Sequence, residues 1–256
     1  MDTRFWGPPG WKLLHQIAYQ YPENPTPEDK LNYGIFYSNL GNVLPCKYCR
    51  NSFTKYHNHL PVHGFLESRE KLTEWVYLIH NKVNGKLRRQ GFLDTPNPSL
   101  KEVNEKYAEC AEVKCQLPGW DFIYSLVFNY SSENPPPQQA SGYLTFFTYL
   151  GKVIPCQEYR QYYNELFHKD PIENHLTTQD SLLKWLYNIN CKINTKLNEK
   201  NKNFSRLCAF YENFKAGACK KKSHKGKTCH RKVLKLPSSH KIFVLNKQTQ
   251  KKIKSD

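Results

Sequence analysis

An internal repeat constrains this 256-residue chain more than any other feature of its sequence. The segment VLPCKYCRNSF at 43–53 returns 110 positions later as VIPCQEYRQYY. PGWKLLHQIAYQY at 9–21 likewise matches PGWDFIYSLVFNY at 118–130, and EWVYLIHNKVNGKL at 74–87 matches KWLYNINCKINTKL at 184–197. A register kept over such a long stretch indicates a duplication, so we expect two related lobes.

Both copies have the apolar spacing of amphipathic helices. In residues 68–87 apolar side chains recur at intervals of three and four, and Ser68 is placed to cap the helix. Pro45 suits the first turn of another helix, and residues 9–21 and 29–42 supply two more. No stretch alternates apolar and polar residues as strands do. We therefore predict an all-α fold of two four-helix bundles, with a first lobe (1–109), a degenerate second lobe (116–205) and a basic, flexible tail (206–256).

The positive charge of the chain is concentrated in the tail. The whole sequence carries 38 Lys and Arg against 22 Asp and Glu, a net charge of +16. Residues 206–256 hold 15 of these basic residues and 2 acids, a net charge of +13. We expect the tail to contact nucleic acid or acidic surfaces. The sequence has no apolar run long enough for a membrane span and no apolar core for a signal peptide, which predicts a soluble protein.

The first lobe contains a C-x-x-C pair, Cys46 and Cys49, directly after Pro45. At a helix start, backbone N–H groups and the helix dipole favour a thiolate, and a thiol next to a second cysteine can exchange disulfides. Three other readings stay open. The pair could bind zinc with His57 and His59, act as a thioredoxin-like dithiol, or be incidental. We favour the redox reading because of the motif that follows.

HNKVNGKL at 80–87 places His80, Val83 and Asn84 on one helical face. Together with WGPPGWKLLH at 6–15 and the P-C-x-x-C motif, this set resembles the Erv/ALR family of FAD-linked sulfhydryl oxidases. The family motifs W-G-P…W…L-H, P-C-x-x-C and H-N-x-V-N-x-x-L occur here in the same order. The two-lobed layout further resembles the enzymes of giant DNA viruses.

The resemblance implies a four-helix bundle that binds FAD beside a redox-active Cys46–Cys49 disulfide. It implies that Cys49 lies nearer the flavin, that Cys46 exchanges with substrate thiols and that His80 belongs to the catalytic site. The residues implied to contact FAD are Trp6, Gly7, Trp11, His15, His80, Asn81, Val83, Asn84, Lys86 and Leu87. Cellular members often carry a stapling cysteine shortly after the last motif, but residues 88–100 contain none.

The implied reaction oxidises the dithiols of substrate proteins to disulfides and reduces O2 to H2O2. The resemblance implies that it supports disulfide formation in virion proteins, in the host cytoplasm or the virion. It also implies a possible homodimer, because Erv lobes pair. The alternative is a non-enzymatic, basic structural protein that binds zinc and nucleic acid.

The second lobe keeps the scaffold and loses the site. At the equivalent positions Cys49 becomes Tyr159, His80 becomes Asn190 and His15 becomes Tyr124. We therefore predict a non-catalytic lobe, which docks where a second subunit would sit or offers a surface to substrates. A disulfide between Cys156 and Cys191, which takes the place of Asn81, is a further alternative.

The remaining cysteines include candidates for a shuttle that relays oxidising equivalents to Cys46, as the family requires. Cys110 and Cys115 lie in the expected linker between the lobes, where they are either a possible shuttle or a local clasp. In the tail, the spacing of Cys219, His224 and Cys229 leaves a shuttle, a zinc site or a solvated basic arm open.

Overall fold

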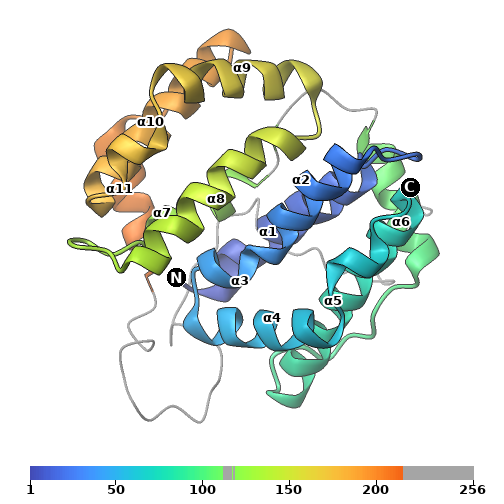
Figure 1. Cartoon of the computed structure of the whole chain (residues 1–256). Helices are drawn as coiled ribbons and strands as arrows, with labels where there is room; N and C mark the ends of the chain where they lie inside the picture. Colours follow the sequence, from blue (N-terminus) through green and yellow to red (C-terminus); the bar gives the residue numbers. More distant parts are fainter. Residues whose placement is uncertain (112–116, 118, 216–256) are drawn as a thin grey trace, which may run out of the picture.

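The computed structural model describes residues 1–111, 117 and 119–215, and it confirms the all-α fold (Figure 1). Apart from one isolated bridge between Glu133 and Thr178, the secondary structure of this part of the chain is helical. The elements of the first lobe are α1 (Thr3–Tyr19), α2 (Pro27–Ser38), α3 (Leu40–Val43), α4 (Lys47–His59), η1 (Val62–Phe65), α5 (Arg69–Arg89) and α6 (Leu100–Ala111).

The second lobe repeats this order of elements. Its elements are α7 (Trp120–Val127), α8 (Pro137–Val153), α9 (Gln157–Lys169), η2 (Ile172–His175), α10 (Gln179–Lys196) and α11 (Phe204–Glu212). A single helix, α8, corresponds to α2 and α3 of the first lobe. One buried apolar core runs through both lobes.

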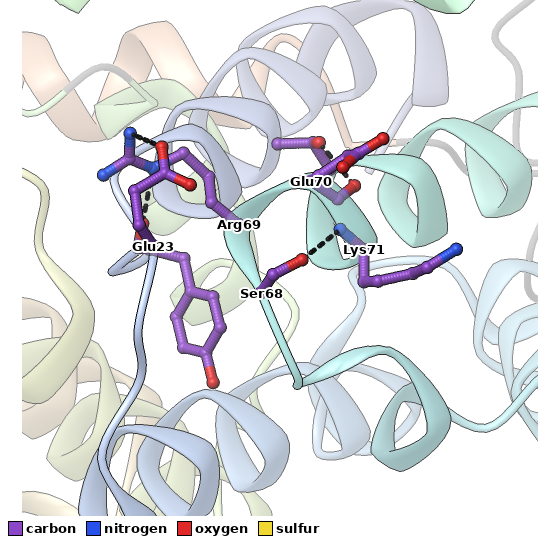
Figure 2. A network of polar contacts seen from close by, with 7 residues as sticks. Glu23, Ser68, Arg69, Glu70 and Lys71 are labelled. Carbon is purple, nitrogen blue, oxygen red and sulfur yellow. Dashed lines mark hydrogen bonds and ion pairs between the residues drawn. The ribbon is translucent and has the colours of Figure 1, made fainter.

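Side-chain caps fix where the helices begin. Thr26 and Asp29 form a reciprocal capping box at the start of α2. At the start of α5 the Ser68 hydroxyl accepts a hydrogen bond from the Lys71 amide (Figure 2). The neighbouring Arg69 pairs with Glu23 at 2.6 Å, which ties α5 to the segment after α1. These bonds anchor the start of α5, the helix that carries most of the residues predicted to contact FAD.

Equivalent hydrogen bonds in the two lobes support the duplication. The Tyr21 hydroxyl donates to the carbonyl of Leu66 at 2.8 Å, and the Tyr130 hydroxyl donates to that of Leu176 at 2.7 Å. The indole of Trp75 donates to the Leu60 carbonyl at 2.8 Å. Trp185 makes the equivalent bond to Asp170 at the same distance. The scaffold was therefore kept in detail.

The two lobes pack through a pseudo-two-fold interface in which α1 lies against α7 and α2 against α8. A Cβ atom at Gly10 would lie 3.0 Å from the ring of Phe122, and one at Gly119 would lie 2.9 Å from Leu13. These are reciprocal contacts, because Gly119 is equivalent to Gly10 and Phe122 to Leu13. Such reciprocity defines an isologous interface, so the lobes pair as two subunits of a dimer would.

The rings of Phe36 and Phe146 show where this pseudo-two-fold axis passes. The two residues occupy equivalent positions, and their centroids are 5.5 Å apart. Only residues near a two-fold axis can contact their own equivalents. Next to them, the Asn39 amide donates to the carbonyl of Gly142 at 2.7 Å, a buried polar bond that fixes α2 and α3 against α8.

The structure differs from the sequence expectations at three boundaries. Helix α4 begins at Lys47 with Cys46 as its N-cap residue, so Pro45 precedes the helix instead of opening it. Helix α6 occupies part of the expected linker. Helix α11 crosses the tail boundary expected at residue 206, and Leu207, Tyr211 and Phe214 are buried, so residues 206–215 belong to the packed second lobe.

The physical reason for this last difference is a ring contact that joins the first and last described segments. The rings of Phe5 and Phe214 stack with centroids 3.8 Å apart, and the Asp2 amide donates to the Phe214 carbonyl. These contacts bury apolar surface that a solvated tail would expose. The described helices include none that is long and apolar enough to cross a membrane.

Candidate functional site

One face of α1 carries three of the predicted site residues. Gly7, Trp11 and His15 are spaced by four residues and therefore lie along the same side of the helix. Trp6 lies on a different side and packs against Phe122 of the second lobe, with centroids 5.9 Å apart. The structure thus groups Trp11 with His15 as predicted and places Trp6 at the interface between the lobes.

Helix α5 brings His80 to the same place. The His80 ring stacks on Trp11 with centroids 3.9 Å apart and an interplanar angle of 8°. Its Nδ1 lies 3.0 Å from Nε2 of His15. The two motifs that were 65 positions apart in sequence are therefore in direct contact, as the family resemblance implied.

Tyr107 of α6 completes this group, and the sequence analysis missed it. Its ring stacks on His15 with centroids 4.9 Å apart and an interplanar angle of 15°. We call Trp11, His15, His80 and Tyr107 the aromatic cluster. A sequence signal was present, because Leu100, Val103 and Tyr107 have helical spacing after the capping box of Ser99 and Glu102.

Both histidines of the aromatic cluster are neutral at physiological pH. Burial lowers the pKa of His15 to about 3, and the charge of Lys106 adds to the effect. Burial also lowers the pKa of His80 well below its usual value, with a further contribution from His15. Two neutral rings 3.0 Å apart share one N–H, so one nitrogen donates and the other accepts. The histidine pair therefore presents a polar but uncharged surface.

The redox pair, Cys46 and Cys49, lies at the start of α4. The structure holds them as thiols that hydrogen-bond to each other. This bond, and then burial, raises the pKa of Cys49 well above its usual range, while the charge of Lys86 opposes the rise. When Cys46 is the thiolate, Cys49 therefore keeps its proton and donates the hydrogen bond to Cys46. The helix start favours that charge on Cys46.

Lys86 connects the redox pair with α5. Its ammonium donates to the hydroxyl of Ser52 on α4 at 3.0 Å and lies within electrostatic range of Cys49. His80 lies six residues earlier on the same helix, about 9 Å away along the axis. The redox pair and the aromatic cluster are thus held on one rigid element.

Cys46 is enclosed, with 1% of its surface exposed, whereas Cys49 is partly exposed. The amino group of Met1 donates to the Pro45 carbonyl at 3.3 Å and lies within electrostatic range of both cysteines. Burial lowers the pKa of that amino group, and the two cysteines oppose the shift. The amino-terminal segment therefore helps to enclose Cys46.

The second lobe carries different side chains at the equivalent site. The Tyr124 hydroxyl donates to Asn190 at 3.1 Å, in the positions of His15 and His80. Tyr159, in the position of Cys49, is 2% exposed. Ile193 is 1% exposed, whereas the equivalent Val83 of the first lobe is only partly buried. The first lobe therefore leaves apolar surface open where the second lobe is closed.

These observations test whether the residues fit the FAD that the resemblance implies. Flat aromatic and imidazole faces suit a ring system, and partly open Val83 and Leu87 offer apolar surface on the same helix as Asn84 and Lys86. A Cβ at Gly7 would have no neighbour within 4 Å, so α1 is open there. Asn81 is half-buried beside His80. The donor set fits the cofactor, and the indole Nε1 of Trp6 is buried without a hydrogen-bond partner in the described residues.

The structure bears on the other cysteines only in part. Cys110 lies in the last turn of α6, and the remaining shuttle candidates Cys115, Cys219 and Cys229 are outside the described residues. Cys156 is disulfide-bonded, but Cys191 is a free thiol, so the alternative of a Cys156–Cys191 disulfide is wrong.

The zinc alternative finds no group of ligands in the described residues. Among them, no three His, Cys, Asp or Glu side chains are gathered so that they could hold a metal ion. His57 instead lies 3.3 Å from the Ser38 hydroxyl, and His59 bonds to the carbonyl of Lys55. The tail positions of that hypothesis, Cys219, His224 and Cys229, lie outside the described part of the chain.

Comparisons with known proteins agree with the motifs. The model of the Erv1 / Alr family matches residues 9–108 and again residues 118–225. A probable FAD-linked sulfhydryl oxidase of Acanthamoeba polyphaga mimivirus is 44% identical over 85 residues, which is 33% of this chain and 59% of the relative. The mitochondrial FAD-linked sulfhydryl oxidase ERV1 of Saccharomyces cerevisiae is 38% identical over 92 residues, or 36% of this chain.

These matches cover only part of each protein. The match spans 59% of the length of the mimivirus relative and 47% of that of the Saccharomyces relative. Among solved structures, the yeast Erv1 core is 32% identical, with a TM-score of 0.38, over 42% of this chain and 84% of the core.

Proposed function

The chain belongs to the Erv1/Alr family, and we propose that it is an FAD-dependent sulfhydryl oxidase that converts protein dithiols to disulfides and reduces O2 to H2O2. The observation that carries this proposal is the placement of Cys46 and Cys49 beside Lys86, on the helix that also presents His80 to Trp11 and His15. The names of the mimivirus and Saccharomyces relatives support the same activity.

FAD would be held by the aromatic cluster together with Gly7, Asn81, Val83, Asn84, Lys86 and Leu87. When bound, FAD supplies an acceptor for the two electrons of the dithiol and a route for them to O2. The neutral histidine pair presents an N–H donor and an acceptor without placing a charge against the ring.

The redox pair performs the thiol chemistry in its disulfide form. A substrate thiolate attacks Sγ of Cys46, the Cys46–Cys49 bond breaks, and Cys49 leaves as a thiolate. The nearby charge of Lys86 favours this departure because it stabilises the anion. A second substrate thiolate then attacks the mixed disulfide and releases Cys46, so the substrate is oxidised by two electrons and the redox pair is reduced.

Cys46 is the partner for the substrate in this scheme, and Cys49 is the one that faces the cofactor. The helix start stabilises the released Cys46 thiolate. The hydrogen bond between the two sulfur atoms keeps Cys49 protonated while Cys46 carries the charge. The role of His80 in this reaction would be to help hold the cofactor.

We further infer that the second lobe is non-catalytic and covers the face of α1 and α2 in the first lobe. Tyr159 is buried in the position of Cys49, and Tyr124 and Asn190 replace the two histidines. A homodimer remains a prediction, and it would need a surface other than this face, which α7 and α8 occupy. The proposed location is the host cytoplasm or the virion of a large DNA virus, supported by the similarity to the mimivirus protein.

A reaction balance tests the proposed function. The FAD-loaded protein is mixed with a reduced, unfolded dithiol protein, and the lost thiols, the consumed O2 and the H2O2 formed are all counted. The proposal predicts one O2 consumed and one H2O2 formed for every two thiols lost. Protein that binds no flavin, or thiol loss without H2O2, would contradict it and would favour the non-enzymatic alternative.

A further inference from the structure

The segment between α5 and α6 is held against α5 by several hydrogen bonds, of which Asn97 accepts two. Asn97 Oδ1 accepts a hydrogen bond from Nδ2 of Asn84 at 3.0 Å and another from Nη2 of Arg88 at 2.5 Å. Arg88 Nε also donates to the Thr95 carbonyl at 2.9 Å, and the Tyr77 hydroxyl donates to the Pro98 carbonyl at the same distance. We call these contacts the Asn97 clamp.

The donors of the Asn97 clamp all lie on one side of α5. Tyr77, Asn84 and Arg88 are separated by seven and four residues, a spacing that repeats the same helical face. Residues 88–100 contain no cysteine, so hydrogen bonds and not a disulfide hold this segment against the helix. One carbonyl oxygen thereby joins two side chains of α5.

The Asn97 clamp bears on the cofactor site in two ways. It fixes which way the amide of Asn84 points, because the N–H group is committed to Asn97. It also ends two residues before α6, whose start is set by the Ser99 and Glu102 capping box. Helix α6 in turn carries Tyr107 to His15.

The second lobe provides a natural comparison. Its Tyr187 hydroxyl donates to the Lys202 carbonyl at 2.7 Å, which is equivalent to the contact of Tyr77. Its Asn194, equivalent to Asn84, is instead bonded to Asn190 at 3.3 Å. The lobe without a cofactor site therefore keeps the tyrosine contact, while its asparagine bonds within α10.

We propose that Asn97 is a positioning residue of the FAD site: it holds the Asn84 amide and, through the 95–99 segment, the helix that presents Tyr107. This inference rests on the proposed function. Asn97 itself need not touch the cofactor.

The test is a titration of FAD-free protein with FAD, followed by flavin fluorescence, for the wild type and three variants. In Asn97→Ala both bonds are lost, and FAD binding should weaken at least about tenfold. In Asn97→Asp a carboxylate still accepts from Asn84 and Arg88, so affinity should stay within about threefold of wild type. The matched control is Asn58→Ala on the exposed side of α4, which should bind FAD like the wild type.

The outcomes separate the clamp from the proposed function. If the wild type binds FAD and Asn97→Ala binds it equally well, the clamp proposal is overturned while the function stands. Equal losses in Asn97→Ala and Asn97→Asp would also overturn it, because a merely structural disturbance is not rescued by an acceptor. No FAD binding by the wild type would refute the function and the clamp together. If circular dichroism shows that Asn97→Ala is unfolded, Asn97→Ser takes its place with the same expected loss.

Discussion

Exchanging the buried histidine pair for its counterpart in the second lobe should remove a defined part of the pH dependence of stability. The change is His15→Tyr with His80→Asn, the pair found as Tyr124 and Asn190 with a 3.1 Å hydrogen bond. This fold therefore accommodates the substituted pair. The exchange keeps a polar contact but removes two groups that titrate.

The sign follows from the pKa values. Histidine in an unfolded chain has a pKa of about 6.5, whereas burial lowers that of His15 to about 3 in the folded protein. The unfolded chain therefore binds more protons between these values, and folding stability falls as the pH falls through this window. Linkage gives a loss of about 2 kcal/mol from His15 between pH 7 and 5. His80, whose pKa is also lowered, adds to it.

The assay is urea denaturation of the FAD-free wild type and double variant at pH 7 and pH 5, followed by circular dichroism. All other titratable groups are shared, so their contribution cancels in the difference. Between pH 7 and pH 5, the free energy of unfolding of the double variant should fall by at least about 2 kcal/mol less than that of the wild type. Replacing the exposed, non-titrating Asn58 by Ala is the control and should leave the dependence unchanged. Equal losses in the wild type and the double variant would refute the buried, neutral pair.

Three further predictions concern the second lobe and the tail. Cys156→Ser should leave oxidation of dithiothreitol almost unchanged, and a large loss of oxygen uptake would contradict a non-catalytic second lobe. Tyr159→Cys restores the C-x-x-C pattern there but should bring no second flavin, because Tyr124 and Asn190 still replace the two histidines; two flavins per chain by absorbance would refute this. Deleting residues 220–256 should preserve FAD content and dithiothreitol oxidation while weakening salt-sensitive binding to polyanions, and loss of bound FAD would count against it.

The repeat and the helical spacing were enough to predict the fold class, and the family resemblance named three of the four residues of the aromatic cluster. Trp11, His15 and His80 meet because each lies at a helical interval from its motif neighbours and α1 packs on α5. Tyr107 was within reach of the same reasoning, since its helix has both a capping box and regular apolar spacing. It was missed because the motifs used to predict the site end at Leu87, well before this helix.

Other features depend on contacts between distant segments, which local patterns do not encode. The stack of Phe5 on Phe214 decides that residues 206–215 belong to the folded body. The enclosure of Cys46 depends on the neighbouring amino-terminal segment. Trp6 belongs to a family motif, yet its side of α1 faces Phe122 of the second lobe. In each case tertiary packing overrides what the local sequence indicates.

The central claim is that one lobe, through Cys46 and Cys49, carries out the chemistry of the whole chain. Oxygen uptake with dithiothreitol, measured together with flavin absorbance, tests it most directly. If the first lobe alone is catalytic, the wild type, Cys46→Ser and Cys49→Ser should each bind one FAD per chain. Oxygen uptake should be seen in the wild type alone. Uptake at the wild-type rate in either variant, or a wild type without flavin, would contradict it.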